Sequence, residues 1–404
     1  MNFDERIRAL IAYAYERAPA FRDRLDSAGV APDEIQSAAD LSKIPVMPKD
    51  DLIELQRNAP PFGGLLTVDP ATLPRIYISP GPIYDPQPLP DEENAEHALA
   101  PFRAVGLEAG DRVLNTFMYH LTPAGLLVDT ALRALGATVI PTGPGNTDLQ
   151  VMMIMGLNVS GYVGTPSFLA ILLDKAAEMG IPPQAIPIKK ALFSAEPYTP
   201  SQRARFEGDH GMQTTSAYGT ADLGFIGYTK ASVTGFCLMN SIYVETVDPE
   251  TGQSVEPGSV GEIVVTTFNK SYPLIRFGTG DLGALAPQPD PNCDGSQQLL
   301  GLFGRSGDAI KVRGMFLHPN QILAAMSRID AVKHAQAVIT RVDNRDVVTV
   351  RVETHPDKPQ TDIDEAVRSY VQSMARLRVD AVEVVPPGTI DPTQRTIRDE
   401  RGWE

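Results

Sequence analysis

The sequence contains little cysteine. Cys237 and Cys293 are the two cysteines among 404 residues, too few for a disulfide framework or for a zinc site with four cysteines. We therefore expect two unpaired thiols and a reducing compartment, the cytoplasm. The six histidines are scattered along the chain and, with the separated cysteines, show no metal-ligand spacing. These two residue types predict no metal centre.

Basic residues and long apolar runs are also scarce. The 35 Lys and Arg residues face 50 Asp and Glu residues, which gives a formal net charge of -15. A nucleic-acid-binding surface needs a basic face to neutralise phosphates, so this balance argues against one. No stretch approaches the roughly 20 apolar residues of a membrane span. The first residues, MNFDERIRALIAYAYERA, lack the basic and apolar segments of a secretory signal peptide. We expect neither nucleic acid nor membrane as a partner.

The patterns that are present indicate a large α/β protein. A chain of 404 residues is too long for one compact core, which predicts two or three domains. Residues 3–28 have apolar residues at helical spacing, which predicts one amphipathic helix. Farther along, the β-rich runs RVLNTFMYH, ATVIPTG and GYVGT alternate with helix-like stretches. This alternation predicts parallel βαβ units, whose ligands bind at the carboxyl ends of the strands.

The second half of the chain has a different pattern. From about residue 240, short strands such as IYVETVD and GEIVVTTF are joined by Pro- and Gly-rich turns, which predicts an antiparallel β-rich subdomain over about 240–303. Residues 308–404 contain β-α-β-like segments typical of a small α+β domain. We predict an α/β fold with a large N-terminal domain over 1–305 and a small C-terminal domain over 306–404.

Several stretches occur in the order found in one known family. They are YAYERAPAFRDRLDSAGV, LSKIPVMPKDDL, LGATVIPTGPGNT, YVGTPSFLAILLDKA, SAEPYT, SAYGTADLG, YPLIRFGTGDLG and GRSGDAIKVRGMFLHPNQI. Together they cover nearly the whole chain, which resembles phenylacetate-CoA ligases of the AMP-forming acyl-CoA synthetase superfamily. The resemblance implies that a carboxylic acid attacks ATP to give an acyl-adenylate and that CoA then displaces AMP. It also implies a mobile C-terminal domain and a homodimer.

The resemblance assigns residues to the adenine side of a nucleotide site. In SAEP, Ala195 and Glu196 would line the adenine pocket, whereas the simpler alternative is a turn with a solvated glutamate. In SAYGTADLG, Tyr218 would pack on adenine, because a planar ring offers stacking area at little entropic cost. Gly219 and Thr220 match the residues that follow this aromatic in the family. The alternative for Tyr218 is a core tyrosine followed by a turn.

The ribose and metal positions are occupied by carboxylates. Asp281 of RFGTGDLG would accept hydrogen bonds from both ribose hydroxyls, although Gly-Asp is also common in turns. Asp222 stands where the family has a glutamate associated with Mg²⁺, and its shorter arm still allows metal ligation. Arg305 matches an arginine on the nucleotide side at the domain junction. Arg276 and Thr279 match beside Asp281.

The phosphate loop departs from the family pattern. The family run RIHASSGTTGKP cradles the β- and γ-phosphates with hydroxyls, glycines and a lysine, and here the run reads RIYISPGPIYDP. The retained positions include Ser79 and Gly81; the changed ones are Pro82, Ile83, Tyr84 and Asp85. Proline removes a backbone donor, and Asp85 puts a negative charge where the polyphosphate would lie. We expect impaired ATP-dependent adenylation.

Three positions of the C-terminal domain are assigned in the same way. The family uses a lysine near its C-terminus during adenylation, but the last lysine here is Lys358. Arg395 would replace it as a cation of different donor geometry, or is an exposed tail arginine. Gly307 stands at the hinge residue, where glycine permits rotation. Gly314 matches a residue beside the pantetheine path.

The segment NTFMYHLTPAG falls where the family places its acyl pocket. Phe117, Tyr119 and His120 are therefore candidates to contact the acyl group. A lone histidine is more often a satisfied core or loop residue, and that alternative applies to His120.

Three readings of the function stay open. The first is an acyl-CoA ligase that uses ATP, CoA, Mg²⁺ and a small carboxylic acid. The second is a non-catalytic homologue that binds AMP or an acyl-CoA. The third is an acyl transferase that acts on a preformed adenylate or thioester, since thioester formation depends less on the phosphate loop and the lysine. We predict a ligase-like protein with impaired adenylation.

Overall fold

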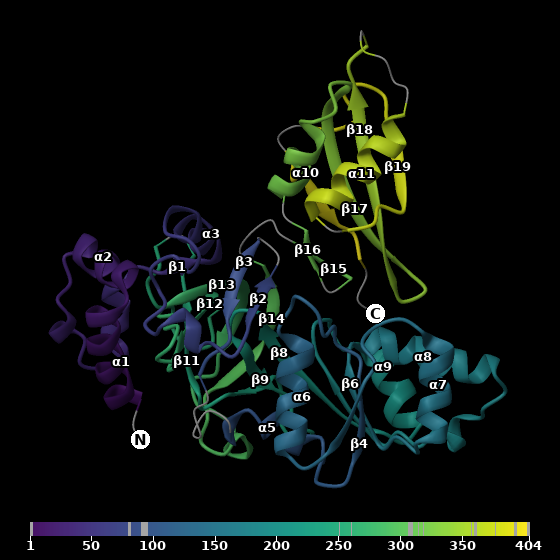
Figure 1. Cartoon of the computed structure of the whole chain (residues 1–404), viewed down its shortest axis with the longest axis horizontal. Helices are drawn as coiled ribbons and strands as arrows, with labels where there is room; N and C mark the ends of the chain where they lie inside the picture. The colour runs from purple at the N-terminus through teal and green to yellow at the C-terminus, as the bar shows by residue number, and fades with distance from the viewer. Residues whose placement is uncertain are drawn as a thin grey trace. The chain divides into compact units, whose positions relative to one another are not determined.

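The computed structural model describes most of the chain in two compact units. They are Met1–Ser306 and Gly307–Glu404, and each is considered by itself (Figure 1). The described residues are 3–79, 82–89, 96–249, 251–259, 261–305, 310–313, 315–317, 319–356, 358, 362–375, 377–391 and 394–401. Gly81, Gly307 and Gly314, three of the predicted site residues, lie outside them.

Parallel strands form one half of the main sheet in the larger unit. Their order is β5-β4-β6-β7-β8, and every neighbouring pair is parallel. The strands are β4 (Arg112–Asn115), β5 (Thr138–Pro141), β6 (Gly161–Gly164), β7 (Lys190–Phe193) and β8 (Gln213–Thr220). The helices between them are α6 (Ala124–Ala134), α7 (Thr147–Gly156), α8 (Pro166–Glu178) and α9 (Pro200–Arg203). The predicted βαβ alternation is confirmed.

Helices cover both faces of these parallel strands. Val113 and Leu192 point to the face where α6 packs with Val128 and Leu132. Their neighbours in sequence point to the opposite face, which α7 and α8 cover (Figure 1). Because successive strand residues alternate between faces, strands buried on both sides read as continuous apolar runs. This explains why such short runs predicted strands.

The other half of the main sheet is antiparallel and joins the parallel half at β8. From β8 the order continues β9-β10-β14-β13-β12-β11, with antiparallel neighbours throughout. These strands are β9 (Gly224–Tyr228), β10 (Phe236–Leu238), β11 (Ile242–Val247), β12 (Gly261–Thr267), β13 (Phe277–Leu285) and β14 (Gln298–Arg305). The short β1 (Met47–Pro48) adds to β13 in parallel. The antiparallel region predicted beyond residue 240 is therefore present, but it continues the parallel sheet.

The N-terminal region contains two helices where the sequence predicted one. They are α1 (Phe3–Arg17) and α2 (Pro19–Ala28). Ala18 between them is extended, with φ -109° and ψ 97°. Pro19 lacks an N–H and favours the first turn of a new helix, so the chain bends before it. The predicted apolar face is nevertheless buried in both helices. Farther on lie α3 (Lys49–Asn58), α5 (Ala100–Ala104) and the hairpin of β2 (Ile76–Ser79) and β3 (Ile83–Pro86).

The expectation of two unpaired thiols is wrong. Cys237 and Cys293 form a disulfide, with Cα atoms 5.2 Å apart, and both side chains are buried. Cys237 lies on β10, where it pairs with Gln298 of β14. That pairing folds the Pro-rich loop before β14 back over β10 and brings the two sulfur atoms together. A separation of 56 residues hides such a contact from sequence reasoning.

The smaller unit has a sheet covered by two helices. Its strand order is β19-β18-β17-β20, with a long antiparallel pair at the centre and parallel strands at the edges. The strands are β17 (Val332–Val342), β18 (Arg345–Thr354), β19 (Ala381–Val384) and β20 (Ile397–Asp399). The helices α10 (Pro319–Met326) and α11 (Ile363–Ala375) contribute to its apolar core. The hairpin of β15 (Ile310–Val312) and β16 (Met315–Leu317) precedes them.

Candidate functional site

Several predicted residues gather at the carboxyl edge of the parallel strands. Phe117, Tyr119 and His120 follow β4, and Ala195 and Glu196 follow β7. The predicted SAYGT segment ends β8, which lies beside β7. In sheets of this kind ligands bind outside the carboxyl ends of the strands, so the fold brings these candidates to the edge expected of a binding site.

A tyrosine, an aspartate and an arginine that the sequence assigns to a nucleotide site form a connected group. The Tyr218 hydroxyl donates to Asp281 Oδ2 at 2.8 Å, and Arg305 Nε lies 3.1 Å from Asp281 Oδ1. Asp281 and Arg305 are register partners on β13 and β14. Burial, and then the charge of Asp281, raise the pKa of Tyr218 well above its usual value. The hydroxyl therefore stays protonated and acts as a donor.

Tyr218 is more deeply buried than a stacking residue would need to be. Only 7% of its surface is exposed, and its ring belongs to the main core, 6.2 Å from the ring of Phe236. The ring of Tyr218 is thus part of the core, which agrees with the alternative interpretation of this residue as a core tyrosine. What reaches the site is its hydroxyl, which orients the carboxylate of Asp281.

The end of β8 needs a glycine. A Cβ at Gly219 would lie 2.4 Å from the carbonyl oxygen of Gly224 on β9. Thr220 Oγ1 accepts a hydrogen bond from Leu223 N–H at 3.3 Å, within the turn that follows. These contacts shape the backbone that carries Asp222 toward its partners.

Asp222 has a cationic partner that the sequence did not predict. Its Oδ2 lies 2.7 Å from Lys49 Nζ, and its side chain is 1% exposed. Its Oδ1 has no hydrogen-bond partner among the described residues. Lys49 is the first residue of α3. A lysine is unfavourable at a helix N-terminus, where acidic residues are preferred, and this is the local signal that it pairs elsewhere.

The segment predicted to be an altered phosphate loop forms a β-hairpin whose described residues have one buried and one exposed face. Tyr77, Ser79, Ile83 and Asp85 are buried, whereas Tyr84 is 42% exposed. Burial, and then the charge of Asp222, raise the pKa of Asp85 to about 7. Asp85 Oδ2 has no hydrogen-bond partner among the described residues. The hairpin therefore directs a second buried carboxylate toward the Lys49–Asp222 pair.

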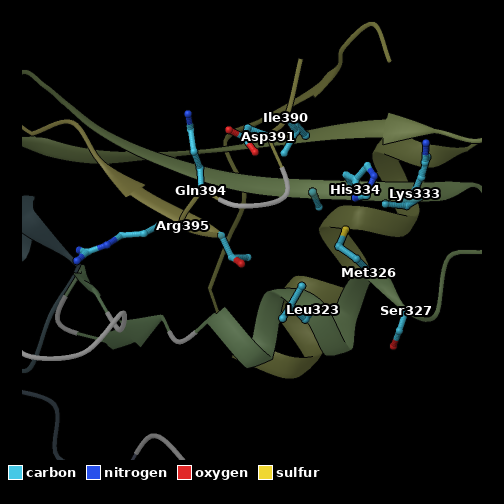
Figure 2. A pocket seen from close by; sticks show the side chains of 12 residues that line it. Leu323, Met326, Ser327, Lys333, His334, Ile390, Asp391, Gln394 and Arg395 are labelled. Carbon is cyan, nitrogen blue, oxygen red and sulfur yellow. The ribbon is translucent and has the colours of Figure 1, made fainter. Parts of the chain in front are cut away.

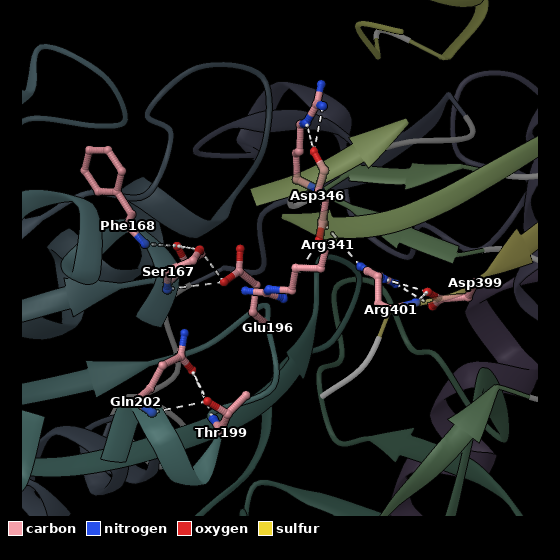
Figure 3. A network of polar contacts seen from close by, with 11 residues as sticks. Ser167, Phe168, Glu196, Thr199, Gln202, Arg341, Asp346, Asp399 and Arg401 are labelled. Carbon is pink, nitrogen blue, oxygen red and sulfur yellow. Dashed lines mark hydrogen bonds and ion pairs between the residues drawn. The ribbon is translucent and has the colours of Figure 1, made fainter. Parts of the chain in front are cut away.

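Glu196 caps a helix. Its Oε2 accepts a hydrogen bond from Ser167 Oγ at 2.5 Å, at the first turn of α8 (Figure 3). A carboxylate is stabilised there by the helix dipole and by exposed N–H groups. The preceding Ala195 has φ 75°, a left-handed conformation that costs a non-glycine residue about 1 kcal/mol or more. Glu196 is thus bonded at the first turn of a helix and is not the solvated turn residue of the alternative interpretation.

The three predicted acyl-pocket residues have different environments. The Tyr119 hydroxyl accepts from Asn115 Nδ2 at 2.8 Å and donates to Asp129 Oδ2 at 3.0 Å. Burial and Asp129 raise the pKa of Tyr119, so its proton stays in place. Phe117 packs against the main core, and His120 is exposed. His120 therefore does not share an enclosure with the other two.

Arg276 has a structural role. It is fully buried, its Nε lies 3.2 Å from Glu245 Oε2, and its Nη2 donates to the Gly252 carbonyl at 2.8 Å. Its Nη1 donates to the carbonyl of Ile44 at 2.5 Å. The guanidinium thus fixes the chain before β1 against β13, which also positions Lys49.

Arg395 lines a pocket that is formed by residues of the smaller unit. The pocket has a volume of about 280 Å³ and also contains Met326, Lys333, His334 and Ile390. Figure 2 shows the guanidinium of Arg395 directed away from His334. Arg395 is exposed.

An arginine–aspartate network holds the end of the smaller unit. Asp346 lies 3.2 Å from Arg401 Nη1 and 3.8 Å from Arg341 Nη1 (Figure 3). It also accepts from the backbone N–H of Arg313 at 3.0 Å, and Arg401 contacts Asp399 at 2.7 Å. The network ties β20 to the β17–β18 hairpin.

Comparison with known proteins identifies the family. A model of the AMP-binding enzyme matches residues 95–269, and a model of the AMP-binding enzyme C-terminal domain matches residues 314–401. The phenylacetate-coenzyme A ligase of Aromatoleum evansii is 32% identical over 366 residues, covering 87% of this chain and 81% of that ligase. This chain belongs to the phenylacetate-CoA ligase family. The ligase of Thermus thermophilus is also 32% identical, over 362 residues that cover 87% and 80% of the two chains.

Solved structures of acyl-CoA ligases share the fold of this family member. A crystal structure of 2-hydroxyisobutyryl-CoA ligase, in complex with 2-HIB-AMP and CoA in the thioesterification state, matches with a TM-score of 0.90. The identity is 25%, and the match covers 99% of this chain and 89% of that one. The predicted α/β fold with a large N-terminal and a smaller C-terminal domain is confirmed.

The described part of this ligase-family chain lacks two kinds of feature. It contains no helix long and apolar enough to cross a membrane. Nor does this part contain a group of three or more histidine, cysteine, aspartate or glutamate residues placed to hold a metal ion.

Proposed function

We propose that this chain is an acyl-CoA ligase whose ATP-dependent adenylation is impaired. In this proposal it binds AMP, CoA and a small carboxylic acid, and forms the thioester from a preformed acyl-adenylate. The observation that carries the proposal is Asp85, buried beside Asp222 at the position where the family pattern has the phosphate-loop lysine.

The charges around the hairpin oppose a polyphosphate. Asp85 and Asp222 are two buried carboxylates with Lys49 as the cation that contacts one of them. When both are ionised, the group carries an excess negative charge. A phosphate charge ~4 Å from an ionised carboxylate is repelled by about 4 kcal/mol at an effective dielectric constant near 20. Because the pKa of Asp85 is raised to about 7, this repulsion applies above that pH, whereas below it the neutral carboxyl provides no attraction for phosphate. The family lysine would have attracted the same charge.

The ribose side supports binding of the adenosine unit. Asp281 is oriented by Tyr218 and Arg305, and each carboxylate oxygen keeps a further lone pair for a ribose hydroxyl. A ligand with one phosphate therefore gains these contacts without placing charge beside Asp85.

Thioester formation needs little from the altered residues. The CoA thiolate attacks the acyl carbonyl carbon, a C–S bond forms, and the C–O bond to the phosphate of AMP breaks. AMP leaves with the electron pair. Pyrophosphate takes no part in this step, so neither the hairpin nor a cation at Arg395 has to act on it. Arg395 is proposed only as a weak substitute for the adenylation lysine, because its fork of donors differs from an ammonium.

A magnesium ion fits Asp222 in part. The buried Oδ1 lacks a partner among the described residues, while Oδ2 contacts Lys49. Asp222 would hold the ion through Oδ1, and Mg²⁺ when bound would withdraw charge from the phosphate.

The test compares the two half-reactions. Synthetic acyl-AMP plus CoA should give acyl-CoA far faster than acid plus ATP plus CoA, over a panel of aromatic and short-chain acids. Pyrophosphate release at an ordinary enzymic rate, of order 1–10 s⁻¹, would refute impaired adenylation. Binding of AMP or acyl-CoA with neither half-reaction would favour the non-catalytic homologue.

Assembly is a proposal as well. We propose a homodimer, which the family resemblance supports; the cytoplasmic location stays a prediction from the sequence. Light scattering of the purified protein tests the first. Disulfides are rare in cytosolic proteins, so the Cys237–Cys293 bond weighs against the second.

A further inference from the structure

A glutamine on α3 faces the altered hairpin. Gln56 is only 6% exposed and lies seven residues after Lys49 in the same helix. Two turns of helix separate residues seven apart, so both project from one face. Leu52, between them, is buried on that face. The helix therefore presents a cation, an apolar residue and an amide to the region of the hairpin.

The amide of Gln56 closes the outer edge of β3. The backbone N–H of Tyr84 donates to Gln56 Oε1 at 2.8 Å, and Gln56 Nε2 donates to the Tyr84 carbonyl at 2.8 Å. Gln56 Nε2 also donates to the Tyr272 hydroxyl at 3.2 Å. The side chain thus acts like a further strand residue, bonding both backbone groups of Tyr84.

This contact occupies a backbone N–H group that a phosphate-binding loop would need as a donor. Loops that bind polyphosphates do so largely with backbone N–H groups turned toward the ligand. Here the N–H of Tyr84 is bonded to Gln56, and the N–H of Ile78 is bonded to the Leu121 carbonyl at 2.8 Å. Pro82 has no N–H to offer. The side-chain changes in this loop are thus only one part of the barrier to ATP.

We propose that Gln56 is a specificity-determining positioning residue. It holds the hairpin in the form that withholds the Tyr84 N–H from a phosphate, and so favours a nucleotide with one phosphate over one with three. The inference rests on the proposed function and adds a residue outside the phosphate loop. Gln56 acts through the backbone of Tyr84 and does not itself touch the nucleotide.

The experiment is a cycle of four full-length proteins. They are the wild type, Gln56→Leu, a loop variant and the combination of both; the loop variant carries Pro82→Thr, Ile83→Thr, Tyr84→Gly and Asp85→Lys. Calorimetry measures the affinities for ATP and AMP with Mg²⁺ present. We expect the loop variant to bind ATP more tightly than the wild type. Adding Gln56→Leu should raise ATP affinity about tenfold more, the effect of one charge-assisted hydrogen bond, and leave AMP affinity unchanged.

A second buried glutamine supplies the matched control. Gln150 is 1% exposed, and its Nε2 donates to the carbonyls of Gly143 at 2.9 Å and Gly145 at 2.6 Å. Gln150→Leu removes a comparable set of hydrogen bonds and should leave the ratio of ATP to AMP affinity unchanged. If the effect of Gln56→Leu came only from a general loss of stability, Gln150→Leu would change the ratio of ATP to AMP affinity in the same way.

The outcomes separate the inference from the proposed function. If the wild type binds ATP more tightly than AMP, the proposed function is overturned. If the wild type prefers AMP but Gln56→Leu leaves the ratio unchanged in both backgrounds, Gln56 does not set selectivity. If Gln56→Leu does not fold, Gln56→Met also removes the amide that bonds Tyr84, and an unshifted ratio in that variant is equally decisive. Hydrogen exchange adds a direct readout, because the Tyr84 amide should be protected in the wild type and exposed in Gln56→Leu.

Discussion

Replacing Asp85 with asparagine should change how the stability of the larger unit depends on pH. Burial and Asp222 raise the Asp85 pKa from its ordinary 3.8 to about 7. A carboxyl whose pKa is raised by folding stabilises the native state while protonated. That contribution is present below the pKa of the unfolded chain and is lost as pH rises through the folded value. A rise from 3.8 to about 7 corresponds to about 4 kcal/mol.

Urea unfolding between pH 4.5 and pH 8, in buffer with a metal chelator, measures this effect. The wild type should lose stability relative to Asp85→Asn as pH rises, by about 3 kcal/mol over this range, with most of the change complete near pH 7. Asp222→Asn serves as a second arm, because removing the neighbouring charge should move the midpoint of the change to lower pH. A constant difference between the wild type and Asp85→Asn across this range would refute the reasoning.

Three further predictions concern other residues of the larger unit. Replacing Cys237 and Cys293 with serine should cost about 4 kcal/mol in urea unfolding, because the bond closes a loop of 56 residues in the unfolded chain; a loss below about 1 kcal/mol would contradict this. Tyr218→Phe removes the hydroxyl that orients Asp281 and should weaken AMP binding about fivefold by calorimetry. The loss of binding free energy should exceed the loss of unfolding free energy measured in urea. Lys49→Met leaves Asp222 buried without its cation and should destabilise the protein by about 3 kcal/mol at pH 8, and an unchanged midpoint would count against the ion pair.

Features set by neighbours in sequence could be predicted. The parallel strands follow from short apolar runs, because both faces of these strands are covered. The candidates after β4, β7 and β8 follow from the rule that ligands bind at carboxyl ends. The break between α1 and α2 at Pro19 has a local cause. The helical spacing of apolar residues continues across it, however, so this spacing predicts one helix.

Features that depend on distant contacts could not be predicted. Lys49 meets a partner 173 residues away, and the two cysteines are 56 residues apart. Arg276 matches the family motif that contains Asp281, but the sequence does not show that the fold buries its guanidinium among backbone carbonyls. Sequence alone shows which residues carry charge, whereas burial decides whether such a charge faces a ligand or holds the backbone.

The position of β8 has a consequence for how the larger unit unfolds. This strand is parallel to β7 on one side and antiparallel to β9 on the other, so its hydrogen bonds belong to both halves of the sheet. If either half of the sheet unfolds, the hydrogen bonds of β8 to the other half become exposed to solvent. The larger unit should therefore unfold in one cooperative transition. The central amides of β8 should exchange only through that global event and report the largest free energy of opening in the unit. The smaller unit, with a sheet and core of its own, is free to show a separate transition.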